Sequence, residues 1–107
     1  MPEEDDLRID WTFAAGAAVD QLEPRERAVI DHAVGRLASG APMPDNAILR
    51  LVDPRHPEAE PLFTLRAGPI FRILFRRHGK TIVLLDIVRR AQLEGLQQLR
   101  PHRGDAG

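Results

Sequence analysis

Arginines are the residues of this sequence best suited to chemistry, and they recur through residues 62–90. Arg72 and Arg76 stand an even number of positions apart in an alternating apolar and polar run, so in a strand they share one face, and Arg66 ends the preceding run. A planar guanidinium can donate two hydrogen bonds to two phosphate oxygens, and a strand would hold it rigidly. The spacing predicts a phosphate-binding face. The alternative is that the arginine stems cover an apolar sheet while their guanidinium groups pair with acids of the N-terminal half.

The elements that must position these arginines are two β-hairpins. Three runs rich in Ile, Val, Leu and Phe predict the strands, and Gly-containing dipeptides or tripeptides between them predict the turns. The strands are Leu62–Arg66, Ile70–Arg77 and Lys80–Val88, and the turns are Ala67-Gly68-Pro69 and His78-Gly79. A two-residue loop at His78-Gly79 sets Arg77 opposite Lys80.

That register sorts the side chains of the last hairpin into two faces. One is a core face with a single polar member: Phe71, Ile73, Phe75, Ile82, Leu84, Asp86 and Val88. The other mixes apolar side chains with arginines: Ile70, Arg72, Leu74, Arg76, Thr81, Val83, Leu85, Ile87 and, if the strand continues, Arg89. We expect Asp86 to lie at the rim of the core and to pair with an arginine, because an unpaired buried carboxylate would cost several kcal/mol.

The N-terminal part predicts a strand followed by a helical hairpin. Leu7–Phe13 alternates with period two, and its spacing points Trp11 and Phe13 together into the core. Apolar residues then recur at helical spacing, first from Ala15 to Leu22 and again from Ile30 to Leu37. Pro24 separates the two helices and Ser39-Gly40 ends the second. Within the proline-rich stretch that follows, only Ala47–Val52 predicts a short edge strand.

These elements predict one α+β domain over residues 1–107, a small twisted antiparallel sheet of three or four strands with the helical hairpin packed on one face. Residues 1–6 are expected to be an acidic, frayed N-terminus and residues 100–107 a flexible tail. No apolar run approaches the roughly 20 residues of a transmembrane helix. The sequence holds no cysteine, which excludes disulfides and thiolate metal sites and fits a cytoplasmic protein. No two histidines have metal-ligand spacing, so we expect no metal or other cofactor.

The net charge of −1 conceals an uneven distribution along the chain. Residues 1–31 hold nine acids and three arginines, whereas residues 62–107 hold nine bases and three acids. A basic C-terminal half predicts a surface for an anionic partner such as RNA. The alternative is that the acidic N-terminal half and the basic C-terminal half of the chain neutralise each other on the protein surface.

The order of strand, helical hairpin and antiparallel hairpins resembles the RelE/ParE superfamily of bacterial toxins from type II toxin–antitoxin systems. The residues with the most specific likeness are Leu65-Arg66-Ala67-Gly68-Pro69-Ile70-Phe71-Arg72-Ile73-Leu74-Phe75 and Lys80-Thr81-Ile82-Val83-Leu84-Leu85-Asp86-Ile87-Val88-Arg89-Arg90. They are similar above all to the phage-derived, HigB-like branch. The resemblance spans roughly residues 7–95.

The resemblance implies a ribosome-dependent endoribonuclease that inhibits translation without a metal, in which the 2′-hydroxyl of the messenger RNA attacks the adjacent phosphate. It implies catalytic roles for Arg72, which matches the family's mid-sheet arginine, and for Arg66 and Arg89. It also implies RNA contacts for further basic residues, namely Arg76, Arg77, Lys80 and Arg90. The implied partners are a cognate antitoxin, the ribosome and its messenger RNA.

One departure from the family pattern leaves alternatives open. Nuclease members often place Tyr or His shortly after the basic pair, where this chain has Ala91-Gln92-Leu93-Glu94. Arginine stabilises a phosphorane but does not readily exchange protons, because its pKa is about 12 or higher. The general acid and base are therefore unassigned. The alternative functions are a ParE-like inhibitor of DNA gyrase that acts by binding, and a degenerate, non-catalytic binding member of the family.

Overall fold

A five-stranded sheet forms the centre of the molecule, with strand order β1-β5-β4-β3-β2. The computed structural model describes residues 7–40, 42–44, 46–51 and 60–93. The strands are β1 (Arg8–Trp11), β2 (Ile48–Leu51), β3 (Leu62–Ala67), β4 (Phe71–His78) and β5 (Thr81–Arg89). All neighbours are antiparallel except β1, which pairs in parallel with β5. The predicted α+β class is confirmed, and the first strand extends the predicted sheet as an edge strand beside the last.

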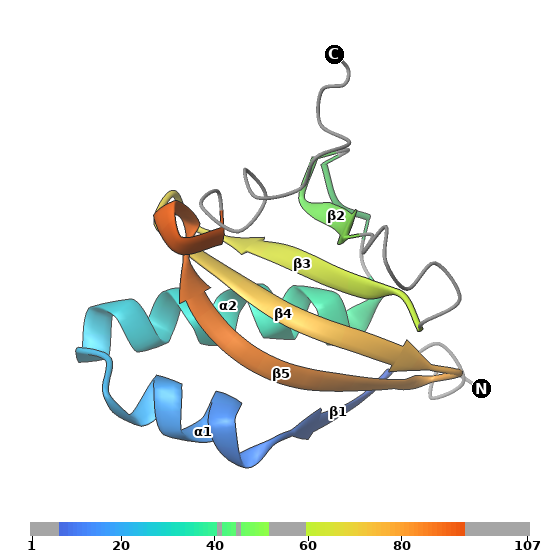
Figure 1. Ribbon diagram of the computed structural model, residues 1–107, viewed down its shortest axis with the longest axis horizontal. Helices are drawn as coiled ribbons and strands as arrows, with labels where there is room; N and C mark the ends of the chain where they lie inside the picture. The colour runs from blue at the N-terminus through green and yellow to red at the C-terminus, as the bar shows by residue number, and fades with distance from the viewer. Residues whose placement is uncertain (1–6, 41, 45, 52–59, 94–107) are drawn as a thin grey trace.

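Two helices, α1 (Phe13–Asp20) and α2 (Pro24–Ser39), cover one face of the sheet (Figure 1). Helix α1 lies against β5 and α2 against β3. Pro24 opens α2, where its missing N–H costs no hydrogen bond, and Glu23 and Glu26 form a capping box before it. Gly40 ends the helix with φ of 71°, a left-handed conformation that glycine adopts without strain. The predicted helical hairpin and its boundaries at Pro24 and Gly40 are confirmed.

The hydrophobic core lies between the helices and the sheet. Its largest fully buried apolar side chains come from α2, β3, β4 and β5: Ile30, Leu65, Ile73, Ile82 and Leu84. Phe63 and Phe75 stack across β3 and β4 with ring centroids 5.4 Å apart. Burial of these apolar side chains is the main force that holds the helices on this face.

The β4–β5 hairpin has a different loop from the one predicted. His78 pairs with Thr81, so the two loop residues are Gly79 and Lys80 rather than His78 and Gly79. Gly79 has φ of 61°, and a tight hairpin loop with glycine first needs a positive φ at that position. The register is therefore shifted by two residues, which leaves the alternation of faces unchanged near the loop.

An irregularity further along the same hairpin does change the faces. Phe75 pairs with Leu84 and Leu74 pairs with Asp86, so Leu85 is an extra residue in β5. A one-residue bulge inverts every later side chain relative to the predicted alternation. The predictions for the end of β5 were wrong for this reason: Ile87 packs against the core, whereas Asp86 and Val88 lie on the opposite face and Arg89 lies opposite Phe71.

The prediction for Trp11 and Phe13 was also wrong. Strand β1 ends at Trp11, and Phe13 begins α1 with a side chain that is 92% exposed. Thr12 causes this change of direction, because its hydroxyl accepts a hydrogen bond from the Ala15 N–H at 3.2 Å and donates one to the Leu84 carbonyl at 2.8 Å. The threonine thus caps α1 and attaches it to β5.

Several expectations concern residues outside the described part of the chain. They are the frayed N-terminus at 1–6 and the tail at 100–107. After β5, a helical turn at Arg90–Leu93 is described. In the described ranges, neither helix has the length and apolar character needed to cross a membrane.

Candidate functional site

Arg66 and Arg72 are direct partners across β3 and β4. Both lie on the sheet face opposite the helices, because their neighbours Leu65, Ile73 and Ala67 are the ones that pack into the core. Directly opposite residues of an antiparallel pair have Cβ atoms about 4.5–5.5 Å apart. Two guanidinium groups at this spacing can bind the same phosphate. We call the face with Arg66, Arg72 and Arg76 the arginine face.

The side chain of Arg72 is held at the turn between β3 and β4. Its Nη1 donates hydrogen bonds to the carbonyl oxygens of Phe71 at 2.7 Å and Gly68 at 3.2 Å. Gly68 adopts φ of 67°, which lets the turn present its carbonyl to the arginine. Arg66 is exposed and Arg72 is half-buried. One guanidinium of the pair is thus fixed by the backbone, and the other extends into solvent.

Arg76 lies further along β4 on the same face, in an ion-pair cluster. Its Nε is 3.8 Å from the Glu60 carboxylate, whose same oxygen is 3.7 Å from His78 Nε2. The Arg76 Nε is itself buried and has no hydrogen-bond partner. Glu60 therefore offsets part of the positive charge at this end of the arginine face.

The other predicted basic residues separate into two groups. Arg77 and Lys80 lie at the β4–β5 loop, where the Arg77 Nε donates to the Gly79 carbonyl at 2.7 Å. Arg90 follows β5 at the opposite end, and its N–H donates to the Ile70 carbonyl in the turn that also holds Arg72. Six residues of strand, roughly 20 Å, separate Arg72 from the loop end of β4. A single phosphate cannot contact both groups.

Arg89 does not share the face of Arg72, contrary to the sequence prediction. The bulge places it opposite Phe71, and its guanidinium carbon lies 5.3 Å from the centre of that ring. A cation over an aromatic ring at this distance is stabilised by the ring quadrupole. Arg89 therefore has a packing contact on the helix side.

Asp86 lies on the arginine face, on which Arg89 was expected to lie. It pairs with Leu74, two residues along β5 from Val88, the partner of Arg72. Its Oδ1 accepts a hydrogen bond from the Ile87 N–H at 2.8 Å. Within the described part of the chain it forms no ion pair with an arginine, so that expectation was wrong. Sequence reasoning missed Asp86 because a bulge has no reliable signal in an alternating run.

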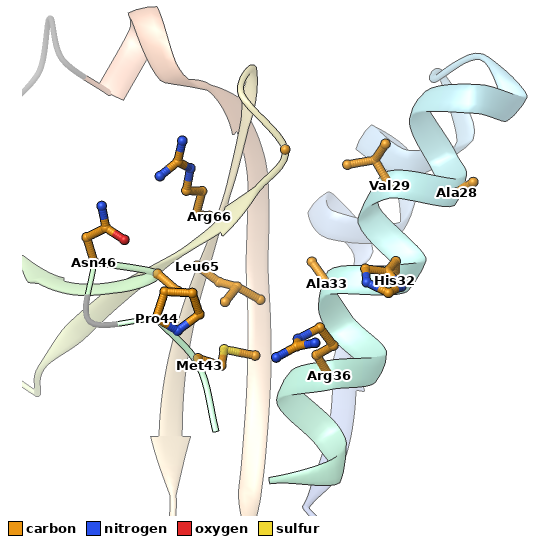
Figure 2. A pocket seen from close by; sticks show the side chains of 12 residues that line it. Ala28, Val29, His32, Ala33, Arg36, Met43, Pro44, Asn46, Leu65 and Arg66 are labelled. Atoms are coloured by element: carbon orange, nitrogen blue, oxygen red, sulfur yellow. The ribbon is translucent and has the colours of Figure 1, made fainter. Parts of the chain in front are cut away.

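A pocket of about 570 Å³ lies between α2 and the sheet. Figure 2 shows Leu65 and Met43 on the sheet side of this pocket, facing Ala33 and Arg36 of α2. Its lining is mostly apolar, with basic side chains at its margin: His32, Arg36 and Arg66. His32 on α2 is exposed. Arg66 thus borders both this pocket and the arginine face.

Metal-binding groups do not converge in the described residues, where no three His, Asp or Glu side chains are placed to share an ion. His78 lies with Glu60 at the far end of β4, and His32 lies on α2. His56 and His102 are outside the described residues. The described site thus combines guanidinium groups with two carboxylates, Glu60 beside Arg76 and Asp86 on β5.

Comparison with solved structures gives close matches in fold. The toxin–antitoxin complex RelBE2 from Mycobacterium tuberculosis matches with a TM-score of 0.61 and 26% identity, over 79% of this chain and 99% of that chain. The fold is that of a RelE-like toxin. YafQ from E. coli strain BL21(DE3) matches with a TM-score of 0.64 and 12% identity, over 81% and 97% of the two chains. A copper-bound mutant toxin from Helicobacter pylori matches with a TM-score of 0.60 and 12% identity, over 81% of this chain and 98% of that chain.

The matches to these toxins extend through nearly the whole length of each relative. No protein-family model and no curated protein sequence matches the chain. The RelE-like architecture anticipated from the order of elements is confirmed, and the structural likeness is to the toxins RelE and YafQ rather than to the HigB-like branch in particular.

Proposed function

We propose that this chain is the toxin of a type II toxin–antitoxin module and that it cleaves messenger RNA on the ribosome, in the cytoplasm. The observation that supports this proposal most directly is the Arg66–Arg72 pair on the sheet face opposite the helices of a RelE-like fold. The likeness to the HigB-like branch rests on the sequence run at residues 65–90 alone.

In the proposed reaction the 2′-hydroxyl of the RNA attacks the adjacent phosphorus and the bond to the 5′-oxygen breaks. Negative charge builds up on the phosphate oxygens in the transition state. Donors fixed in advance stabilise that charge better than water, because they need no reorganisation as the charge develops. Arg72, held by the Phe71 and Gly68 carbonyls, is such a donor. Arg66 supplies a second positive charge opposite it.

The remaining basic residues extend the proposed RNA contact beyond the scissile phosphate. Arg90 lies beside the turn that holds Arg72. Arg76, Arg77 and Lys80 lie along β4 and its loop, and we expect them to bind neighbouring backbone phosphates. Arg89 contributes to the proposal only through its packing on Phe71.

The proposed partner is a cognate antitoxin that covers apolar and basic surface. The pocket between α2 and the sheet offers both, since its apolar lining is bordered by Arg36 and Arg66. The relative RelBE2 was solved as a toxin–antitoxin complex, which supports a partner of this kind. A partner that binds Arg66 would also remove one member of the arginine pair from RNA.

End-mapping of messenger RNA in a reconstituted translation reaction tests the proposed function. We expect cleavage at codon positions that needs both the ribosome and the chain, and that is lost with Arg72→Ala. Arg25→Ala is the matched control, because Arg25 is exposed on α2, on the opposite side of the sheet. Intact messenger RNA at high protein concentration would contradict the nuclease and leave inhibition of DNA gyrase, measured as loss of supercoiling, as the next function to test.

A further inference from the structure

A carboxylate lies beside the arginine pair although neither an ion pair nor the core accounts for it. Asp86 is half-buried in the middle of β5, where aspartate is unfavourable. It is diagonal to Arg72 across the β4–β5 pair, a relation that sets Cα atoms about 7–8 Å apart. The bulge at Leu74/Phe75 is what turns it to the arginine face.

The orientation of this carboxylate is fixed on one side only. Its Oδ1 accepts the Ile87 N–H at 2.8 Å. Arg72 donates to backbone carbonyls of the turn, and among the described residues no ion pair joins it to Asp86. In the described residues, therefore, Oδ2 of Asp86 is available to a ligand bound by the arginines.

The other described groups that could accept a proton are less well placed beside Arg72. Glu60 is paired with Arg76, four residues along β4. Thr64 is on the same face but only 1% exposed, and a hydroxyl is a weak base. His78 is six residues from Arg72 along β4, roughly 20 Å away, and is paired with Glu60. His32 on α2 lines the same pocket as Arg66, but on the helix side of the sheet, whereas Arg72 lies on the opposite face. Asp86 is the described group that meets both requirements, proximity and basicity.

We propose that Asp86 is the general base of the nuclease, an inference that rests on the proposed function. Its carboxylate takes the proton of the 2′-hydroxyl as that oxygen forms a bond to phosphorus. The bond from phosphorus to the 5′-oxygen breaks, and this oxygen takes a proton from water. The products are a 2′,3′-cyclic phosphate and a 5′-hydroxyl, and Asp86 returns its proton to solvent. The arginine pair offsets the repulsion between the carboxylate and the phosphate.

Asp86→Asn separates this role from a purely structural one. Asparagine keeps an oxygen that can accept the Ile87 N–H, but it cannot take the proton. We expect cleavage by Asp86→Asn in the translation reaction to be about 10²–10⁴-fold slower than by the unaltered chain, the usual contribution of a positioned base. The matched control is Asp10→Asn, since Asp10 lies on the same sheet face in β1 and pairs with Arg8 at 3.1 Å, away from the arginine pair.

Chemical rescue gives a readout that a structural role would not change. Formate added to Asp86→Ala is expected to restore cleavage at least about tenfold, because a small carboxylate can occupy the vacated space and accept the proton. Chloride at equal ionic strength should restore nothing, and formate should not accelerate Asp10→Asn. Thermal unfolding of each variant checks that it is folded.

The outcomes separate the two proposals. Cleavage by the unaltered chain together with equal rates for Asp86→Asn would overturn the role of Asp86 and leave the nuclease intact. If cleavage by Asp86→Ala is slow and formate does not accelerate it, the role of Asp86 as the base would also be overturned. Intact messenger RNA with the unaltered chain would overturn both proposals.

Discussion

Arg66 and Arg72 are direct cross-strand partners, so we predict that their contributions to RNA cleavage are coupled. The perturbation is a double-mutant cycle of Arg66→Ala, Arg72→Ala and the double variant. A hydrogen bond to a charged group contributes about 1.5–3 kcal/mol, which corresponds to a loss of roughly 10- to 150-fold for each single variant. Residues in contact commonly show coupling of about 0.5–3 kcal/mol. We expect the double variant to lose less than the product of the single losses, because both guanidinium groups stabilise one phosphate.

The assay is the single-turnover rate of messenger RNA cleavage on programmed ribosomes, which isolates the chemical step from product release. A second cycle that combines Arg72→Ala with Arg25→Ala provides the control, and its losses should be additive within about 0.3–0.5 kcal/mol. Additive losses for Arg66 and Arg72 would refute a shared phosphate. Full activity of either single variant would refute the arginine pair as the site.

Three further predictions concern the fold that supports the site. Phe13→Ala should change the free energy of unfolding, measured by urea titration, by less than about 0.5 kcal/mol, because the side chain is 92% exposed. Ile30→Ala, at 0% exposure, should cost about 2–5 kcal/mol in the same titration. Equal losses for the two variants would contradict the start of α1 at Phe13. Gly68→Ala should cost about 1–2 kcal/mol, since φ is 67° and a Cβ would lie 3.0 Å from Val29 Cγ1, and an unchanged melting temperature would argue against this turn. Arg66→Gln should keep or raise the free energy of unfolding, because like charges directly opposite destabilise a sheet, and a clear loss of stability would mean that Arg66 is structural.

The parts of the fold that follow from local rules were predictable from the sequence. Pro24 begins α2 because proline lacks an N–H that a first-turn residue does not need, and Gly40 ends it because glycine accepts a left-handed backbone. The alternation of apolar residues identified β3, β4 and β5. Arg66 and Arg72 were assigned to adjacent strands on this basis, and the structure pairs them directly.

The parts that depend on strand pairing were not predictable in the same way. A single extra residue at Leu85 moves Asp86 to the arginine face and Arg89 to the helix side of the sheet. An alternating sequence can accommodate such a bulge anywhere along its length. The parallel pairing of β1 with β5 is equally non-local. Thr12 ends β1 early through a hydrogen bond to Leu84, a residue 72 positions away. The face of Asp86, the candidate general base, could therefore not be predicted from the sequence, whereas the shared face of Arg66 and Arg72 could.

The end chemistry of messenger RNA fragments shows whether the chain is a nuclease that uses the 2′-hydroxyl of the RNA. Fragments from a translation reaction with the unaltered chain, and with the Arg66→Ala, Arg72→Ala double variant, would be labelled at their new 5′ ends by a kinase with and without prior phosphatase treatment. We predict ribosome-dependent fragments with 5′-hydroxyl and 2′,3′-cyclic phosphate ends, and no such fragments with the double variant. Intact messenger RNA, or fragments with 5′-phosphate ends, would contradict it.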